Sequence, residues 1–109
     1  MGKDANHETI VREFRRSGAD VVNLANVGMG VPDILVGFAG FDQLVEIKLP
    51  PKAGLAPTRK TNLSIRQRGW HHSWRGRKPV VIRTPEEAEA LLDALLDEAL
   101  RRDRANAAK

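Results

Sequence analysis

Residues 34–48 contain two short apolar runs separated by a glycine turn, and this pattern predicts a β-hairpin. The first strand begins with Ile34-Leu35-Val36, the turn falls over residues 39–42, and the return strand covers residues 44–48. Pro50-Pro51 ends the second strand because proline has no amide hydrogen to give to the ladder. A chain with this hairpin near its middle is committed to a sheet, and its helices have to pack on that sheet.

The segments around the hairpin carry further helical and strand patterns. Asp4 or Asn6 can cap a first helix that ends at Gly18, while Ser64 and Gln67 form a capping-box pattern before a second helix. The predicted elements are a helix over 4–17, a strand over 21–24, the hairpin, a helix over 65–75, a strand over 80–82 and a helix over 86–103. This order predicts one α/β domain over residues 1–109, with a small mixed sheet flanked by helices and an extra C-terminal helix.

Three residues of the hairpin suggest chemistry. With the register centred on Gly40, Asp33 falls nearly opposite Lys48, and Glu46 lies two residues away on the same strand. Side chains alternate along a strand, so Glu46 and Lys48 point away from the core on one face. Two carboxylates and an ammonium group therefore converge at the open end of the hairpin.

That set of groups suits the hydrolysis of phosphodiesters. The chain has no cysteine, so a metal has to bind through oxygen or imidazole. Carboxylates are the ligands that Mg²⁺ and Mn²⁺ prefer, and such a cation activates water and polarises a phosphate. A lysine beside it can stabilise the charge that develops in the transition state. Glu8, near the start of the first helix, is a further candidate acid.

Each of these residues also has an ordinary structural interpretation. Glu46 and Lys48 could form an exposed pair on the solvent face of a hairpin, and Asp33 could cap the turn after Pro32. Glu8 could be a favourable anion at a helix N-terminus. The combination of Pro-Asp, an apolar strand, a glycine turn and the strand carrying Glu46 and Lys48 favours a catalytic site.

A long basic segment follows the hairpin. Residues 47–85 contain no aspartate or glutamate, whereas they carry ten of the chain's lysines and arginines. Such one-sided charge attracts a polyanion, although a solvated basic surface is the alternative. The predicted phosphate-binding residues are Lys52, Arg59, Lys60, Arg66, Arg68, Arg75, Arg77 and Lys78.

The motif Val31-Pro32-Asp33 with Glu46-Ile47-Lys48 resembles the Pro-Asp…(Asp/Glu)-x-Lys signature of the PD-(D/E)XK nuclease superfamily. The small size is similar to the VRR-NUC branch and to archaeal Holliday-junction resolvases, and similar small proteins occur in phages. The resemblance implies a restriction-endonuclease-like αβββαβ core over about residues 6–83, with the amphipathic helix 86–103 added.

The resemblance also implies a role for each matching residue. Asp33 and Glu46 would hold the metal, Lys48 would be the catalytic lysine, and the backbone carbonyl of Ile47 would be a further ligand. Glu8 matches an acid that many members carry on the first helix. Gln67 matches a glutamine on the helix after the hairpin, and the capping box with Ser64 is an equally good explanation of it.

These observations predict a Mg²⁺-dependent (or Mn²⁺-dependent) endonuclease that cuts DNA. A preference for branched or flapped DNA follows from the resemblance alone. We expect a homodimer, which would widen the basic surface, and no small-molecule cofactor. The alternatives are a nucleic-acid-binding module of the same fold without catalysis, and an interaction protein that uses the leucines of the last helix.

The polar start of the chain is unlike a signal peptide, and no apolar run reaches the roughly 18 residues that span a bilayer. We therefore expect no membrane partner and a cytoplasmic location, in the host cell if the gene is carried by a phage. His71 and His72 point about 100° apart on a helix, so they do not chelate one metal together. Trp70 and Trp74 share a helix face, which favours core packing or a dimer interface over base stacking.

Overall fold

Each predicted element is present, within a few residues of its expected bounds. The computed structural model describes residues 6–108, so Asp4 lies outside the described residues. The elements are α1 (His7–Arg16), β1 (Asp20–Asn23), β2 (Ile34–Phe38), β3 (Phe41–Ile47), α2 (Ile65–Ser73), β4 (Val80–Ile82) and α3 (Pro85–Ala107). The chain thus forms a mixed α/β fold, as the sequence predicts.

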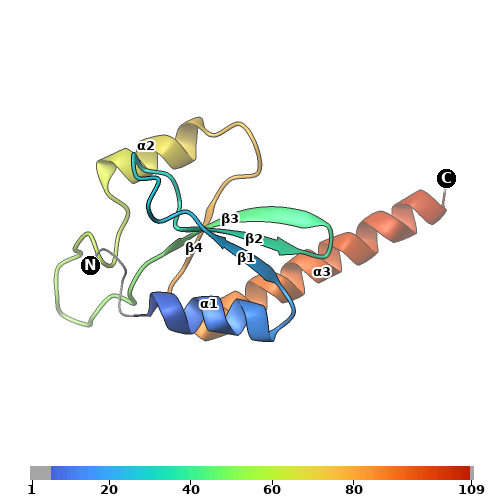
Figure 1. Cartoon of the computed structure of the whole chain (residues 1–109), viewed down its shortest axis with the longest axis horizontal. Helices are drawn as coiled ribbons and strands as arrows, with labels where there is room; N and C mark the ends of the chain where they lie inside the picture. The colour runs from blue at the N-terminus through green and yellow to red at the C-terminus, as the bar shows by residue number, and fades with distance from the viewer. Residues whose placement is uncertain (1–5, 109) are drawn as a thin grey trace.

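The four strands form one sheet in the order β1-β2-β3-β4. β1 pairs with β2 and β2 pairs with β3, both antiparallel, whereas β3 and β4 are parallel. A parallel pair needs a long crossover, and here the segment that contains α2 supplies it (Figure 1). The predicted mixed sheet is confirmed, with β1 and β4 at its edges.

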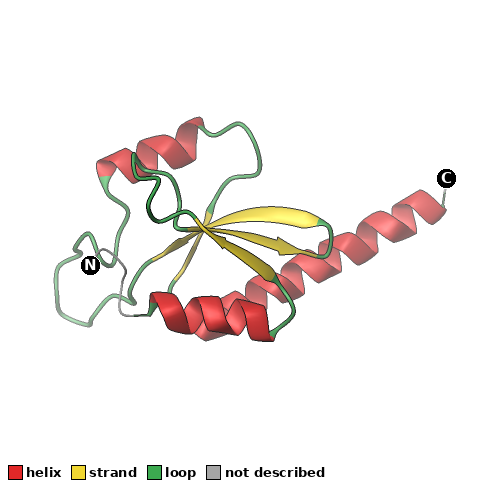
Figure 2. Cartoon of the chain, viewed as in Figure 1, coloured by secondary structure: helices red, strands yellow, loops and turns green. Residues whose placement is uncertain are grey.

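The helices cover the two faces of the sheet unequally. α1 and α3 pack together on one face, and α2 lies on the other (Figure 2). The core between the sheet and α1 and α3 is apolar, and burying each large side chain there stabilises the fold by about 1.5–3 kcal/mol. Its fully buried members include Ile10 and Phe14 of α1, Ile34 and Val36 of β2, and Val45 and Ile47 of β3.

The hairpin turn is tighter than the sequence suggested, and this shifts the register by two residues. Phe38 pairs with Phe41, so the loop is only Ala39-Gly40, with φ values of 54° and 83°. Positive φ at both positions is typical of a two-residue type I′ turn. Ile34 is opposite Val45, and the prediction that Asp33 lies opposite Lys48 is therefore wrong. Continuing the observed register by one residue sets Asp33 beside Glu46 instead.

The start of α1 is tied to the same end of the sheet. Asn6 occupies the N-cap position, but its side-chain amide donates to the carbonyl oxygens of Lys48 (2.9 Å) and Arg83 (2.8 Å). These carbonyls follow β3 and β4, so one side chain joins the helix to both strand ends. Asn6 therefore positions α1 instead of capping it.

α3 extends well past the sheet (Figure 1). Its 23 residues make it about 34 Å long, and only the first half of its leucine stripe is covered. Leu92 and Leu95 are buried, whereas Leu96 and Leu100 are each 46% exposed. Within residues 6–108, no helix combines the length and the apolar character needed to cross a bilayer.

Candidate active site

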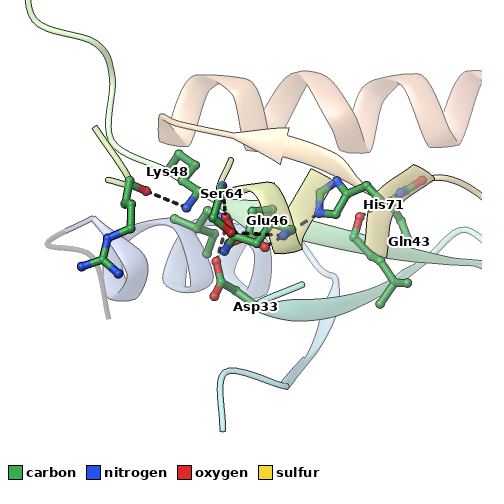
Figure 3. A network of polar contacts seen from close by, with 10 residues as sticks. Asp33, Gln43, Glu46, Lys48, Ser64 and His71 are labelled. Carbon is green, nitrogen blue, oxygen red and sulfur yellow. Dashed lines mark hydrogen bonds and ion pairs between the residues drawn. The ribbon is translucent and has the colours of Figure 1, made fainter. Parts of the chain in front are cut away.

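Asp33 is fixed at the point where β2 leaves the glycine loop. Its backbone carbonyl accepts from the Leu24 amide (2.7 Å), and its side-chain Oδ2 accepts from the Ile47 amide (2.8 Å). The carboxylate thus continues the β2–β3 ladder one step beyond the last backbone pair. Residues opposite each other in an antiparallel pair share a face, so the carboxylates of Asp33 and Glu46 lie together on the face that α2 covers (Figure 3).

Glu46 and Lys48 are buried, with only 2% and 5% of their surface exposed. The alternative of an ordinary exposed pair on the solvent face is therefore wrong. They point away from the apolar core, as alternation predicts, but α2 and the 49–62 loop cover them. The Lys48 ammonium donates to the carbonyl of Arg59 (2.7 Å), and the Leu49 amide donates to the carbonyl of Lys60 (2.6 Å), which holds this loop over the strand end.

Gln67 forms the capping box that the sequence predicts, and it also contacts Glu46; its role in a catalytic site stays a prediction. Its Oε1 accepts from the Ser64 amide (2.9 Å), while the Ser64 hydroxyl accepts from the Gln67 amide (3.1 Å), which completes the capping box. Its Nε2 donates to Oε2 of Glu46 (3.3 Å). Since the amide oxygen is engaged by the helix cap, the amide nitrogen is the group presented to the carboxylate.

His71 also lies beside Glu46, a placement that the sequence pattern alone did not predict. Its Nε2 lies 3.9 Å from Oε1 of Glu46, and its side chain is 12% exposed (Figure 3). Burial lowers the pKa of His71, and the positive charge of Lys48 lowers this pKa further. The available signal was spacing, because His71 is four residues after Gln67 and so shares its helix face.

The fit of α2 against the sheet depends on a glycine. Gly30 has φ of 84°, and a Cβ there would come within 2.7 Å of the Arg66 carbonyl oxygen. The loop between β1 and β2 therefore touches the backbone of α2, at a position where only glycine fits. This contact helps to place Gln67 and His71 above Glu46.

Glu8 lies exposed in the first turn of α1, two residues after Asn6. Asn6 holds this end of the helix near the ends of β3 and β4, so Glu8 is at the same end of the sheet as Asp33 and Lys48. Among residues 6–108, however, no group of three or more His, Asp or Glu side chains is placed to hold a metal ion. Glu8 as a metal ligand stays a prediction.

A basic groove borders the site. Its volume is about 830 Å³, and Arg59, Arg66, Arg68 and Arg83 contribute to its lining. Ser64, which caps Gln67, also lines it, as does Val81, the register partner of Glu46 on β4. The groove lining, all of it within the described residues, includes no acidic side chain. A phosphate chain bound here would pass the edge of the sheet beside Glu46.

The other predicted phosphate-binding residues are distributed more widely. Lys52 and Lys60 are exposed on the 49–62 loop, and Arg75 is exposed just after α2. Arg77 and Lys78, although exposed, are engaged by protein groups. The Arg77 guanidinium makes two hydrogen bonds with the Glu98 carboxylate, which lowers the pKa of Glu98, and it also lies over the Phe41 ring. The Lys78 ammonium donates to the carbonyls of His72 and Trp74.

The donor set at the strand ends fits a hard divalent cation. Asp33 and Glu46 provide carboxylate oxygens from neighbouring strands, and Mg²⁺ commonly binds through one or two carboxylates with water completing its shell. The amide of Ile47 is already bound by Asp33, and its carbonyl remains a predicted ligand. Thiolate is absent from the chain, which agrees with a cation that prefers oxygen.

Comparison of the chain with protein-family models, curated proteins and solved structures finds no match to any of them. The resemblance to the PD-(D/E)XK superfamily thus depends on the motif alone.

Proposed function

We propose that this protein is a Mg²⁺-dependent endonuclease that hydrolyses DNA phosphodiesters. The observation that carries the proposal is the placement of two carboxylates and one lysine at one end of the sheet, with Glu46 and Lys48 buried on the face opposite the core. The order α1-β1-β2-β3-α2-β4 supports an αβββαβ core of the restriction-endonuclease type, to which α3 is added.

Electrostatics favour catalysis over simple binding. Taking a carboxylate and an ammonium group out of water costs several kcal/mol for each ion unless other groups compensate. A module that only held phosphates would gain nothing from Asp33 and Glu46, because carboxylates repel phosphates. A divalent cation held by the carboxylates would remove this repulsion, which would account for acids next to a groove lined by arginines.

Each residue of the site would have its own role in the proposed reaction. Asp33 and Glu46 would hold Mg²⁺, and the cation supplies Lewis-acid activation of water and phosphate when bound. Gln67 orients the Glu46 carboxylate through Nε2. Lys48 would stabilise negative charge on the phosphate oxygens, after exchanging the Arg59 carbonyl for the substrate. The arginines of the groove would hold the phosphates on either side.

A cleavage assay tests the proposal. Labelled single-stranded, duplex, flapped and four-way DNA, and single-stranded RNA, would be incubated with the protein and Mg²⁺, Mn²⁺ or EDTA. We expect metal-dependent cleavage that Asp33→Asn, Glu46→Gln and Lys48→Met each reduce on the order of 100-fold or more. Arg104→Met is the control, since Arg104 is an exposed cation in the last turn of α3, outside the predicted phosphate-binding residues, and should keep nearly full activity.

Metal binding gives a second measurement, independent of turnover. Titration of Mn²⁺ followed by its electron paramagnetic resonance signal should show bound Mn²⁺ in the wild type, and weaker binding in Asp33→Asn and Glu46→Gln. Tight DNA binding without cleavage of any substrate, together with no Mn²⁺ binding, would support the non-catalytic nucleic-acid-binding module instead.

A further inference from the structure

Two tryptophans of the α2 region form a stack outside the core. The rings of Trp70 and Trp74 are 4.8 Å apart between centroids and inclined by 13°. Trp74 is 42% exposed, and Trp70 is half-buried. No residue of α2 (65–73) is fully buried, and neither ring belongs to the apolar core. Core packing, one half of the interpretation that the sequence favoured, is therefore wrong for this pair, and a dimer interface is the other half.

The exposed ring is held in place from several sides. Trp70 covers one face of the Trp74 indole. The Lys78 ammonium donates to the Trp74 carbonyl and to the His72 carbonyl, which fixes the backbone at the end of the helix. Gly76 lies against the edge of the ring, where an added Cβ would be only 2.7 Å from Nε1. An aromatic surface fixed before binding loses little entropy when a ligand stacks on it.

The charge around the stack favours nucleic acid over a second copy of the chain. Arg75 is exposed next to Trp74, and residues 47–85 contain no acid. In a twofold-symmetric dimer formed through this patch, the patch of one copy would face the same patch of the other, and the two Arg75 guanidinium groups would repel each other. An unpaired nucleobase offers a π-face to the indole, and its phosphate offers negative charge to the arginine.

We propose that Trp74 is a stacking platform for an unpaired base of the bound nucleic acid. The proposal rests on the proposed function and names its substrate class: strands with an unpaired segment near the cut. Trp74, the C-cap of α2, follows Gln67 by seven positions, which is about 10 Å along the helix axis. At about 3.4 Å per stacked nucleotide, the platform is roughly three nucleotides from the site.

The chain allows a direct test of this platform. It contains two tryptophans and no tyrosine, so its intrinsic fluorescence reports on this stack alone. In EDTA, without cleavage, we would titrate a single-stranded oligonucleotide, the same strand with abasic residues, and a blunt duplex. The intact single strand should quench the emission strongly, and the abasic strand and the duplex only weakly.

Variants separate stacking from charge. Trp74→Leu should weaken binding of the single strand between about 5-fold and 150-fold, the range of one base stacked on an aromatic ring, and change duplex binding less than 2-fold. Trp74→Phe keeps a ring and should recover part of the loss. Arg75→Gln is the control, because it should weaken single-strand and duplex binding in parallel.

Three results would overturn the platform: equal quenching by intact and abasic strands, equal losses of single-strand and duplex affinity in Trp74→Leu, or a wild-type dimer that Trp74→Leu converts to a monomer. The first comparison uses wild-type protein, so it holds even if a variant folds poorly. Base-dependent quenching without metal-dependent cleavage would support the stacking platform and contradict the nuclease proposal. Metal-dependent cleavage without base-dependent quenching would support the nuclease proposal and contradict the platform.

Discussion

Gln67 shows how one side chain can serve the fold and the candidate site together. Its carbonyl oxygen belongs to the helix cap, and its amide nitrogen belongs to Glu46. The position of α2 over the sheet and the orientation of the carboxylate are therefore coupled through a single amide. Sequence alone could not choose between the two roles, because it shows the Ser64–Gln67 spacing but not which strand lies below the helix.

Gln67→Ala and Ser64→Ala separate these roles. Both remove part of the capping box and should lower the free energy of unfolding by about 1 kcal/mol. Only Gln67→Ala also removes the donor to Glu46, so it should lower cleavage by roughly 10- to 100-fold, the usual effect of losing a group that orients a metal ligand. Urea unfolding and initial cleavage rates would be measured for both variants. Equal activity in the two would show that Gln67 acts only as a cap.

At the scale of elements, the sequence predicts most of this fold. Hydrophobic periodicity locates the helices and strands because each has one apolar face, and the Ser64–Gln67 capping box marks where α2 begins. The register of the hairpin could not be predicted from the sequence. It is set by the two-residue turn, which needs a positive φ at Ala39, and alanine rarely adopts that conformation. The burial of Glu46 and Lys48 could not be read either, because α2 and the 49–62 loop that cover them are distant in the chain.

The strained turn yields a stability prediction. Ala39 has φ of 54°, a conformation that costs an L-residue with an ordinary side chain about 1–2 kcal/mol. Asn tolerates this conformation and precedes glycine in the preferred type I′ turn, so Ala39→Asn should raise the free energy of unfolding by about 0.5–1 kcal/mol. Ala39→Val, with its β-branched side chain, should lower it. Urea denaturation of both variants gives the answer, and a stabilising valine would contradict the type I′ assignment.

At the scale of the whole molecule, charge is segregated. The net charge is +4, yet the groove beside the site is lined by four arginines, while the acids lie before residue 47 and after residue 85. α3 carries arginines too, but Arg101 and Arg102 pair with Asp97 and Glu98 on the same helix. The lining of the groove itself therefore carries four arginines and no acidic side chain.

The salt dependence of DNA binding tests whether the arginines of the groove contact phosphates. If Arg66 and Arg68 contact phosphates, Arg66→Ala and Arg68→Ala should each reduce the slope of log K against log salt by about 0.7–0.9. Arg104→Ala, in the last turn of α3, should leave the slope unchanged. Binding of a fixed oligonucleotide would be followed from low to high KCl in EDTA. Equal changes in all three variants would mean that the protein binds through net charge rather than through the groove.

α2 has no fully buried residue, and this has a consequence for how the molecule opens. A helix attached by a few polar contacts unfolds locally at a lower free energy than the core between α1, α3 and the sheet. Its amides should therefore exchange with deuterium well before those of β2 and β3. Since α2 covers Glu46, the same opening would uncover this carboxylate. α2 would then control access to Glu46, the most buried acid among residues 6–108.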